Sequence, residues 1–143
     1  MATNFFLIPA KMDLYLKAIG WWNLIGSLLM FFLLSESIAN KVLIEWSAIF
    51  TEKYTATFYV KFWLVFAIGL NIFYGLVNIM AGYWEYDNIR SCIIWVDVIA
   101  YIGVLSVAIW GLVAGKCGLG ILVGFLIFSV WILWGIYVLK SAA

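Results

Sequence analysis

Four long apolar stretches separated by polar segments set the pattern of this chain. They cover about residues 14–35, 62–84, 91–115 and 118–140, and a helix needs about 20 apolar residues to cross the hydrocarbon core of a membrane. Each stretch therefore predicts a membrane-spanning helix. Four spans place both termini on the same side of the membrane. The pattern thus predicts an all-α, multi-pass fold, an integral membrane four-helix bundle formed by residues 1–143 as a single domain.

The longest connection, residues 36–61, carries a different pattern. Within it, over about residues 38–50, the apolar side chains of Ile38, Val42 and Trp46 fall along one stripe, whereas the charged residues fall outside it. That spacing is typical of an amphipathic helix lying in the headgroup region. We therefore expect an interfacial helix between the first and second spans, with an ordered loop as the alternative.

The composition agrees with a membrane location. Hydrophobic residues make up 68% of the chain and charged residues only 10%, and the mean hydropathy is +1.14. A soluble domain of this size has too much surface to be so apolar, because most of its exterior must carry polar groups. The composition therefore predicts that lipid is the solvent of most of the chain.

Residue types that the chain lacks narrow its chemistry. It has no histidine, which excludes imidazole ligation of haem or metals and every Ser–His or Cys–His catalytic arrangement. Its two cysteines, Cys92 and Cys117, lie at opposite ends of the third stretch, too far apart along one helix for a disulfide. The sequence predicts no catalytic set, no metal site and no cofactor, although the bundle could hold a lipid or a quinone.

Charged and aromatic residues near the span ends leave the orientation open. The eight basic residues divide equally between the two sides, so the positive-inside rule predicts no orientation. The tryptophans lie near the span ends and predict aromatic belts at the two membrane boundaries. The basic residues are Lys11, Lys17, Arg90 and Lys140 on the side of the termini and Lys41, Lys53, Lys61 and Lys116 on the other.

One acid, Asp97, lies inside the third stretch. Helices joined by a tight turn place residues equally distant from that turn at similar depth, which matches Asn78 with Asp97 and Tyr74 with Tyr101. A polar side chain facing lipid would find no hydrogen-bond partner there. The sequence therefore predicts one inward-facing polar cluster and candidate ligand site, which comprises Asn23, Asn71, Tyr74, Asn78, Asp97 and Tyr101.

Asp97 has two interpretations. An ionisable residue inside a span is a candidate site for a proton, a cation or a polar headgroup. Alternatively, Asp97 is structural and hydrogen-bonds Asn78 and Asn23, or reaches toward Arg90 near the membrane surface. Hydrogen bonds between spans stabilise a fold by only about 0.6 kcal/mol on average, so a packing role alone would account for the polar residues.

Glycines recur at a spacing that permits close helix contact. Gly111 and Gly115 form one GxxxG motif, and Gly120 and Gly124 form a second. Small residues at this spacing let two helix backbones approach closely. We expect these four glycines to act in helix packing, either between the third and fourth spans or against another protein.

Residues 61–140 combine a basic residue before the second span (Lys61), the glycine-bearing segment FAIGLNIFYGL and the sequence Asn88-Ile89-Arg90 at the third span. A closing span rich in tryptophan and glycine follows. This layout resembles that of the small four-helix DoxX-like membrane proteins. The resemblance implies a four-helix membrane fold and no particular activity.

These observations favour a non-catalytic integral membrane protein, an accessory or scaffold subunit of a larger membrane protein complex. The chain has little mass outside the predicted spans and no visible catalytic arrangement. The alternative is a small binding or transport protein with a quinone, lipid or cation site around Asp97, and an enzyme is the third choice. Expected partners are membrane lipids and other integral membrane subunits, or a second copy of the chain. The net charge of +1 gives no reason to expect nucleic acid.

Overall fold

Four long helices dominate the structure, a computed structural model that describes residues 11–142. All four are long and apolar enough to cross a membrane, which confirms the all-α class and is consistent with a multi-pass membrane protein. The described residues contain no β-strand, only an isolated bridge between Phe50 and Cys117. The long helices are α1 (Met12–Met30, continued by the 3-10 turn η1, Phe31–Leu34), α3 (Phe58–Ala81), α4 (Asp87–Val113) and α5 (Ile121–Ala142).

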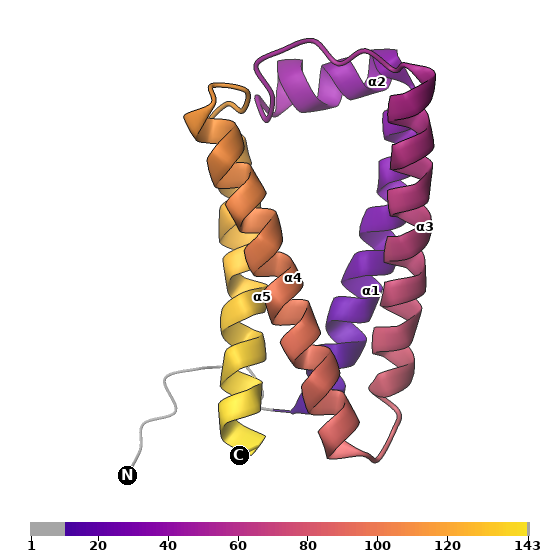
Figure 1. The fold of residues 1–143 in the computed structure, drawn as a ribbon, viewed down its shortest axis with the longest axis vertical. Helices are drawn as coiled ribbons and strands as arrows, with labels where there is room; N and C mark the ends of the chain where they lie inside the picture. Colours follow the sequence, from indigo (N-terminus) through magenta and orange to yellow (C-terminus); the bar gives the residue numbers. More distant parts are fainter. Residues whose placement is uncertain (1–10, 143) are drawn as a thin grey trace.

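The long helices form two antiparallel pairs, α1 with α3 and α4 with α5 (Figure 1). The pairs meet at the end where α1 begins and α5 ends, and they separate toward the opposite end. The layout is therefore two joined helix pairs, and the predicted four-helix bundle is not confirmed. That both termini face the same side of a membrane also stays a prediction.

Two glycines bring α1 and α3 into close contact. A Cβ added at Gly20 would lie 2.6 Å from Ile79 Cγ1 and 2.7 Å from the Gly75 carbonyl oxygen. A Cβ added at Gly75 would lie 2.9 Å from the Gly20 carbonyl oxygen. Small residues at a crossing let helix backbones approach and gain dispersion contacts that lipid chains cannot match. The α1–α3 pair therefore depends on glycine at both positions.

Aromatic packing joins the two pairs at the end where they meet. Tyr15 of α1 is fully buried, and its ring packs edge-on against Trp131 and Trp134 of α5, with centroids 6.1 Å and 5.3 Å away. The Tyr15 hydroxyl donates a hydrogen bond to the Trp131 carbonyl oxygen at 3.4 Å. Val98 of α4 packs into the same core, which therefore ties α1 to both members of the other pair.

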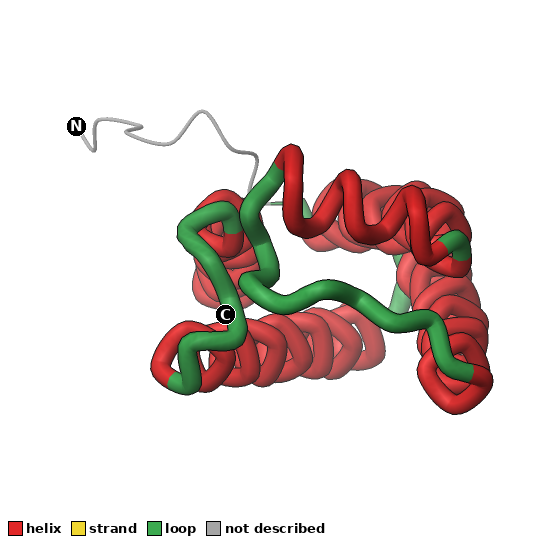
Figure 2. Tube along the Cα trace, turned by 90° about the horizontal axis from the view of Figure 1, so that it is seen from above, coloured by secondary structure: helices red, strands yellow, loops and turns green. Residues whose placement is uncertain are grey.

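The connection between α1 and α3 crosses from one pair to the other and back (Figures 1 and 2). It contains α2 (Glu36–Asn40) and a wider helical turn, η2 (Lys41–Trp46), which together cover most of the predicted interfacial helix. Ala48, with φ +49°, turns the chain after η2. The location of this segment in a headgroup region stays a prediction.

Residues 47–52, which we call the strap, are held against the turn between α4 and α5. Gly120 N donates to the Ala48 carbonyl oxygen at 3.1 Å, and Gly118 N donates to the Ile49 carbonyl oxygen at 2.9 Å. Thr51 N donates to Lys116 O at 3.2 Å. An exposed ion pair between Glu52 and Lys116 accompanies these bonds. Main-chain bonds therefore link the ends of the two helix pairs that lie farthest apart.

Two helices begin earlier than the apolar pattern predicts. The α3 helix begins at Phe58 rather than near residue 62, because the Thr57 hydroxyl oxygen accepts a hydrogen bond from Val60 N at 3.3 Å. The α4 helix begins at Asp87 rather than near residue 91, with an acid in its first turn, where the helix dipole favours negative charge. The first turn of α4 is therefore polar, whereas α3 begins with the aromatic residues Phe58 and Tyr59.

Candidate functional site

The inner faces of α3 and α4 meet at Asn78 and Asp97. Asn78 Nδ2 donates a hydrogen bond to Asp97 Oδ1 at 3.1 Å. Asn78 is fully buried and Asp97 is 1% exposed. The pair forms because both residues lie at a similar depth from the short turn between their helices, as the sequence predicts.

Three buried polar atoms at this point have no hydrogen-bond partner among the described residues. They are Asp97 Oδ2, Asn78 Oδ1 and the Tyr74 hydroxyl. Tyr74 is one turn before Asn78 on α3, and its hydroxyl lies close enough to the Asp97 carboxyl to interact with it, although the two groups do not meet at good hydrogen-bonding geometry. Nearly all buried polar groups in native proteins are paired, so three unpaired atoms in one place require an explanation.

No cation within residues 11–142 compensates the charge of Asp97. Arg90 donates to the carbonyl oxygens of Ala81 at 3.3 Å and Gly82 at 3.4 Å, and it pairs with the exposed Asp87 at 3.4 Å. It therefore caps the end of α3. A contact between Arg90 and Asp97, one of the alternatives that the sequence left open, is absent from the described ion pairs and hydrogen bonds.

A second part of the cluster connects α1 to α3 and α4. The Tyr101 hydroxyl donates to Asn23 Oδ1 at 2.7 Å. Asn71 Nδ2 donates to Ser27 Oγ at 2.9 Å, and the Ser27 hydroxyl donates to the Asn23 carbonyl oxygen at 2.6 Å. The sequence prediction did not include Ser27 in the cluster, although its i+4 spacing from Asn23 places both on one helix face.

The structure thus brings all six predicted residues together on facing sides of α1, α3 and α4. They divide into a paired group and an unpaired group. The polar atoms around Asn23 have partners, whereas three of the polar atoms around Asp97 do not. We call the second group, Tyr74, Asn78 and Asp97, the Asp97 site.

A groove of about 470 Å³ lies beside the Asp97 site. Tyr74 and Asn71 are its polar members, and the remaining lining is apolar. Val96 and Ala100, which flank Asp97 on α4, belong to this lining and are exposed. The groove therefore opens on the outer surface of the helices, where a membrane would place lipid. Its lining residues are Met30, Ala67, Leu70, Asn71, Tyr74, Val96 and Ala100.

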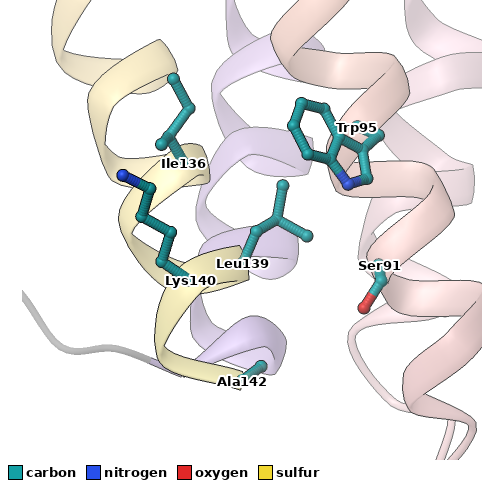
Figure 3. Close-up of a pocket in the computed structure, with 6 residues that line it drawn as sticks. All are labelled: Ser91, Trp95, Ile136, Leu139, Lys140 and Ala142. Atoms are coloured by element: carbon teal, nitrogen blue, oxygen red, sulfur yellow. The ribbon is translucent and has the colours of Figure 1, made fainter.

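A second groove, of about 380 Å³, lies between α4 and α5 near the end of α5 (Figure 3). Lys140 and Ser91 lie on opposite sides of it. Lys140 is exposed and Ser91 Oγ already contacts Met12 Sδ at 3.6 Å. This groove holds no fully buried polar group, so it offers no pre-arranged site comparable to that at Asp97.

At none of the four glycines of the GxxxG motifs are the atoms nearest to an added Cβ those of another long helix. A Cβ at Gly111 would meet Cys117 Sγ of the following turn at 2.6 Å, and Gly115 has φ +69° at the end of α4. A Cβ at Gly120 would overlap the Ser47 carbonyl oxygen of the strap. Gly124 has only Phe128 of its own helix nearby, at 3.9 Å. Their role in docking another protein stays a prediction.

The described residues contain no group of three or more His, Cys, Asp or Glu side chains that could hold a metal ion. Comparison of the chain with protein-family models, with curated proteins and with solved structures gave no match. The resemblance to DoxX-like proteins stays a prediction. Functional proposals for this chain therefore start from the Asp97 site.

Proposed function

We propose that this chain is a small integral membrane binding protein. It takes a membrane-soluble ligand sideways from the lipid and holds the polar end of that ligand at the Asp97 site. The observation that carries this proposal is the set of three unpaired buried atoms on Tyr74, Asn78 and Asp97. A buried polar group without a partner costs about 1–3 kcal/mol. A ligand that pairs with all three atoms would recover that free energy on binding.

The adjoining groove supports the second half of the proposal. Its lining is mainly apolar, as expected for the hydrocarbon part of a ligand. Tyr74 belongs both to the groove and to the Asp97 site. A molecule lying in the groove could therefore reach the polar atoms without crossing the interior of a helix pair.

Native mass spectrometry of the protein released from its source membrane tests this proposal. We expect a small-molecule adduct on the unaltered chain that is lost in Asp97→Asn and in Tyr74→Phe. Asp87→Asn is the matched control for the first change, because Asp87 is the same residue type on the same helix with a side chain that is 72% exposed. Tyr83→Phe, at a residue that is 70% exposed, controls the second.

The controls also define the contradictory results. An adduct that survives both Asp97→Asn and Tyr74→Phe would lie elsewhere on the molecule. A protein that carries no adduct dependent on Asp97 would overturn the proposal.

A second candidate function is an accessory or scaffold subunit of a larger membrane complex. It is supported by how little of each span is covered within the chain, because only 17–28% of the most apolar window of each span is buried. In this role, helices of neighbouring subunits would cover part of the remaining surface. Purification in mild detergent followed by mass spectrometry of co-purifying proteins tests it, and a lone monomer would contradict it.

A further inference from the structure

The unpaired atoms of the Asp97 site are mostly hydrogen-bond acceptors. Asn78 Nδ2 is already committed to Asp97 Oδ1. This leaves Asn78 Oδ1 and Asp97 Oδ2, which accept, and the Tyr74 hydroxyl, which can donate or accept. The opposite orientation of the Asn78 amide would place two oxygens against each other. With Asp97 ionised, an occupant that pairs these atoms supplies at least two N–H or O–H donors.

The charge of Asp97 further limits which ligands could occupy the site. Asp97 is 1% exposed and has no cationic partner within residues 11–142. A buried carboxylate without a compensating charge is strongly disfavoured. A neutral donor such as water supplies hydrogen bonds but leaves this charge uncompensated. An occupant that carries a positive charge satisfies both requirements.

Several ligand classes are poorly matched to these hydrogen-bond acceptors and to the charge of Asp97. A phosphate group is an anion and a quinone carbonyl is only an acceptor, so both would face oxygen lone pairs at the site. A divalent cation is usually held by several oxygen ligands that include more than one carboxylate, and the site has one. A primary ammonium group carries three N–H donors and a single positive charge, which matches three oxygen atoms and one carboxylate.

We infer that the ligand is a lipophilic primary amine, whose ammonium group binds at the Asp97 site and whose hydrocarbon body lies in the adjoining groove. This inference rests on the proposed binding function and specifies the chemistry of its ligand. The ammonium donates to Asp97 Oδ2, Asn78 Oδ1 and the Tyr74 oxygen. The apolar lining of the groove, with Val96 and Ala100 flanking Asp97, contacts the hydrocarbon.

Three probes with the same alkyl chain separate charge from hydrogen bonding. The protein is placed in phosphatidylcholine nanodiscs at pH 7, and binding of dodecylamine, dodecyltrimethylammonium and dodecanol is measured, with empty nanodiscs subtracted. Dodecyltrimethylammonium keeps the charge and has no N–H donor, whereas dodecanol has a donor and no charge. We expect dodecylamine to bind at least ten-fold more tightly than either of the other probes.

Variants test whether the preference for dodecylamine arises at the Asp97 site. Asp97→Asn should remove the preference for dodecylamine, and Asp87→Asn should leave it intact. Tyr74→Phe should reduce it several-fold, whereas Tyr83→Phe should not, because phenylalanine retains the ring that Lys17 covers at 4.0 Å. Nanodiscs that also contain phosphatidylethanolamine identify the source of the ammonium. Displacement of dodecylamine would identify the ethanolamine headgroup, and the absence of displacement would identify a free amine.

The outcomes distinguish this inference from the proposed function. Equal binding of dodecanol and dodecylamine, lost for both in Asp97→Asn, would retain the binding function and overturn the ammonium ligand. Equal binding of dodecyltrimethylammonium and dodecylamine would show that the ligand needs no N–H donor, and would overturn the primary amine. Binding of all three probes that is unchanged in Asp97→Asn would overturn both proposals.

Discussion

Replacing Gly20 by alanine should separate α1 from α3. The added Cβ would lie 2.6 Å from Ile79 Cγ1, which could move, but also 2.7 Å from the Gly75 carbonyl oxygen and 2.9 Å from Ile79 N, which are backbone atoms. Contacts this short require the two helices to move apart. Inserting a methyl group into a tightly packed contact typically costs about 1–3 kcal/mol.

Gly26→Ala on the same helix provides the reference. A Cβ at Gly26 would have no atom within 4 Å, so this variant measures the gain in helix propensity alone. That gain is common to both substitutions and cancels in their difference. We therefore expect Gly20→Ala to be less stable than Gly26→Ala by about 1–3 kcal/mol.

Equilibrium unfolding in lipid bicelles, measured by titration with a denaturing detergent, gives both free energies. The double variant Gly20→Ala/Gly75→Ala adds a further check, because one separation of the helices relieves both clashes. The double variant should therefore lose less free energy of unfolding than the two single variants lose in total. Equal stability of Gly20→Ala and Gly26→Ala would refute the close α1–α3 contact.

Gly120→Ala should speed hydrogen exchange at the amides that hold the strap, Thr51 N and Gly118 N, because the added Cβ would overlap a strap carbonyl oxygen. Gly124→Ala should leave this exchange unchanged. Equal exchange rates in the two variants would contradict the docking of the strap. Tyr101→Phe leaves Asn23 Oδ1 without its donor, and we expect a loss of about 1 kcal/mol in the free energy of unfolding; an unchanged value would show that the acceptor finds another partner. Lys116→Gln removes an exposed ion pair and should change the free energy of unfolding by less than about 1 kcal/mol; a larger change would indicate a role beyond this pair.

The contact between Asn78 and Asp97 could be predicted from sequence because a short turn fixes depth. Two helices that leave the same turn place residues at equal distance from it side by side, whatever the later course of the helices. The pair of Tyr74 and Tyr101 shows the limit of this argument. Their depths match, but Tyr101 bonds Asn23 on α1, because rotation about the helix axis and the position of a third helix decide which partner is reached.

The pairing of α1 with α3 could not be predicted in the same way. Gly20 and Gly75 are single glycines on different helices, and neither belongs to a GxxxG motif. Their contact depends on how the helices cross and produces no periodic signal within either one. The motif at Gly120 and Gly124 is periodic, yet its first member serves a loop contact. Spacing identifies positions where close approach is allowed, and the approaching segment is decided by the tertiary fold.

The strap also sets how widely the two helix pairs can open. Met30 and Leu70 on one pair and Val96 and Ala100 on the other line the same groove, so the groove widens or narrows as the pairs move. At one end the pairs are joined by packed aromatic rings. At the other end main-chain hydrogen bonds act as a tether of fixed length. In the proposed binding function, the length of this backbone segment would limit the width of the groove beside Asp97.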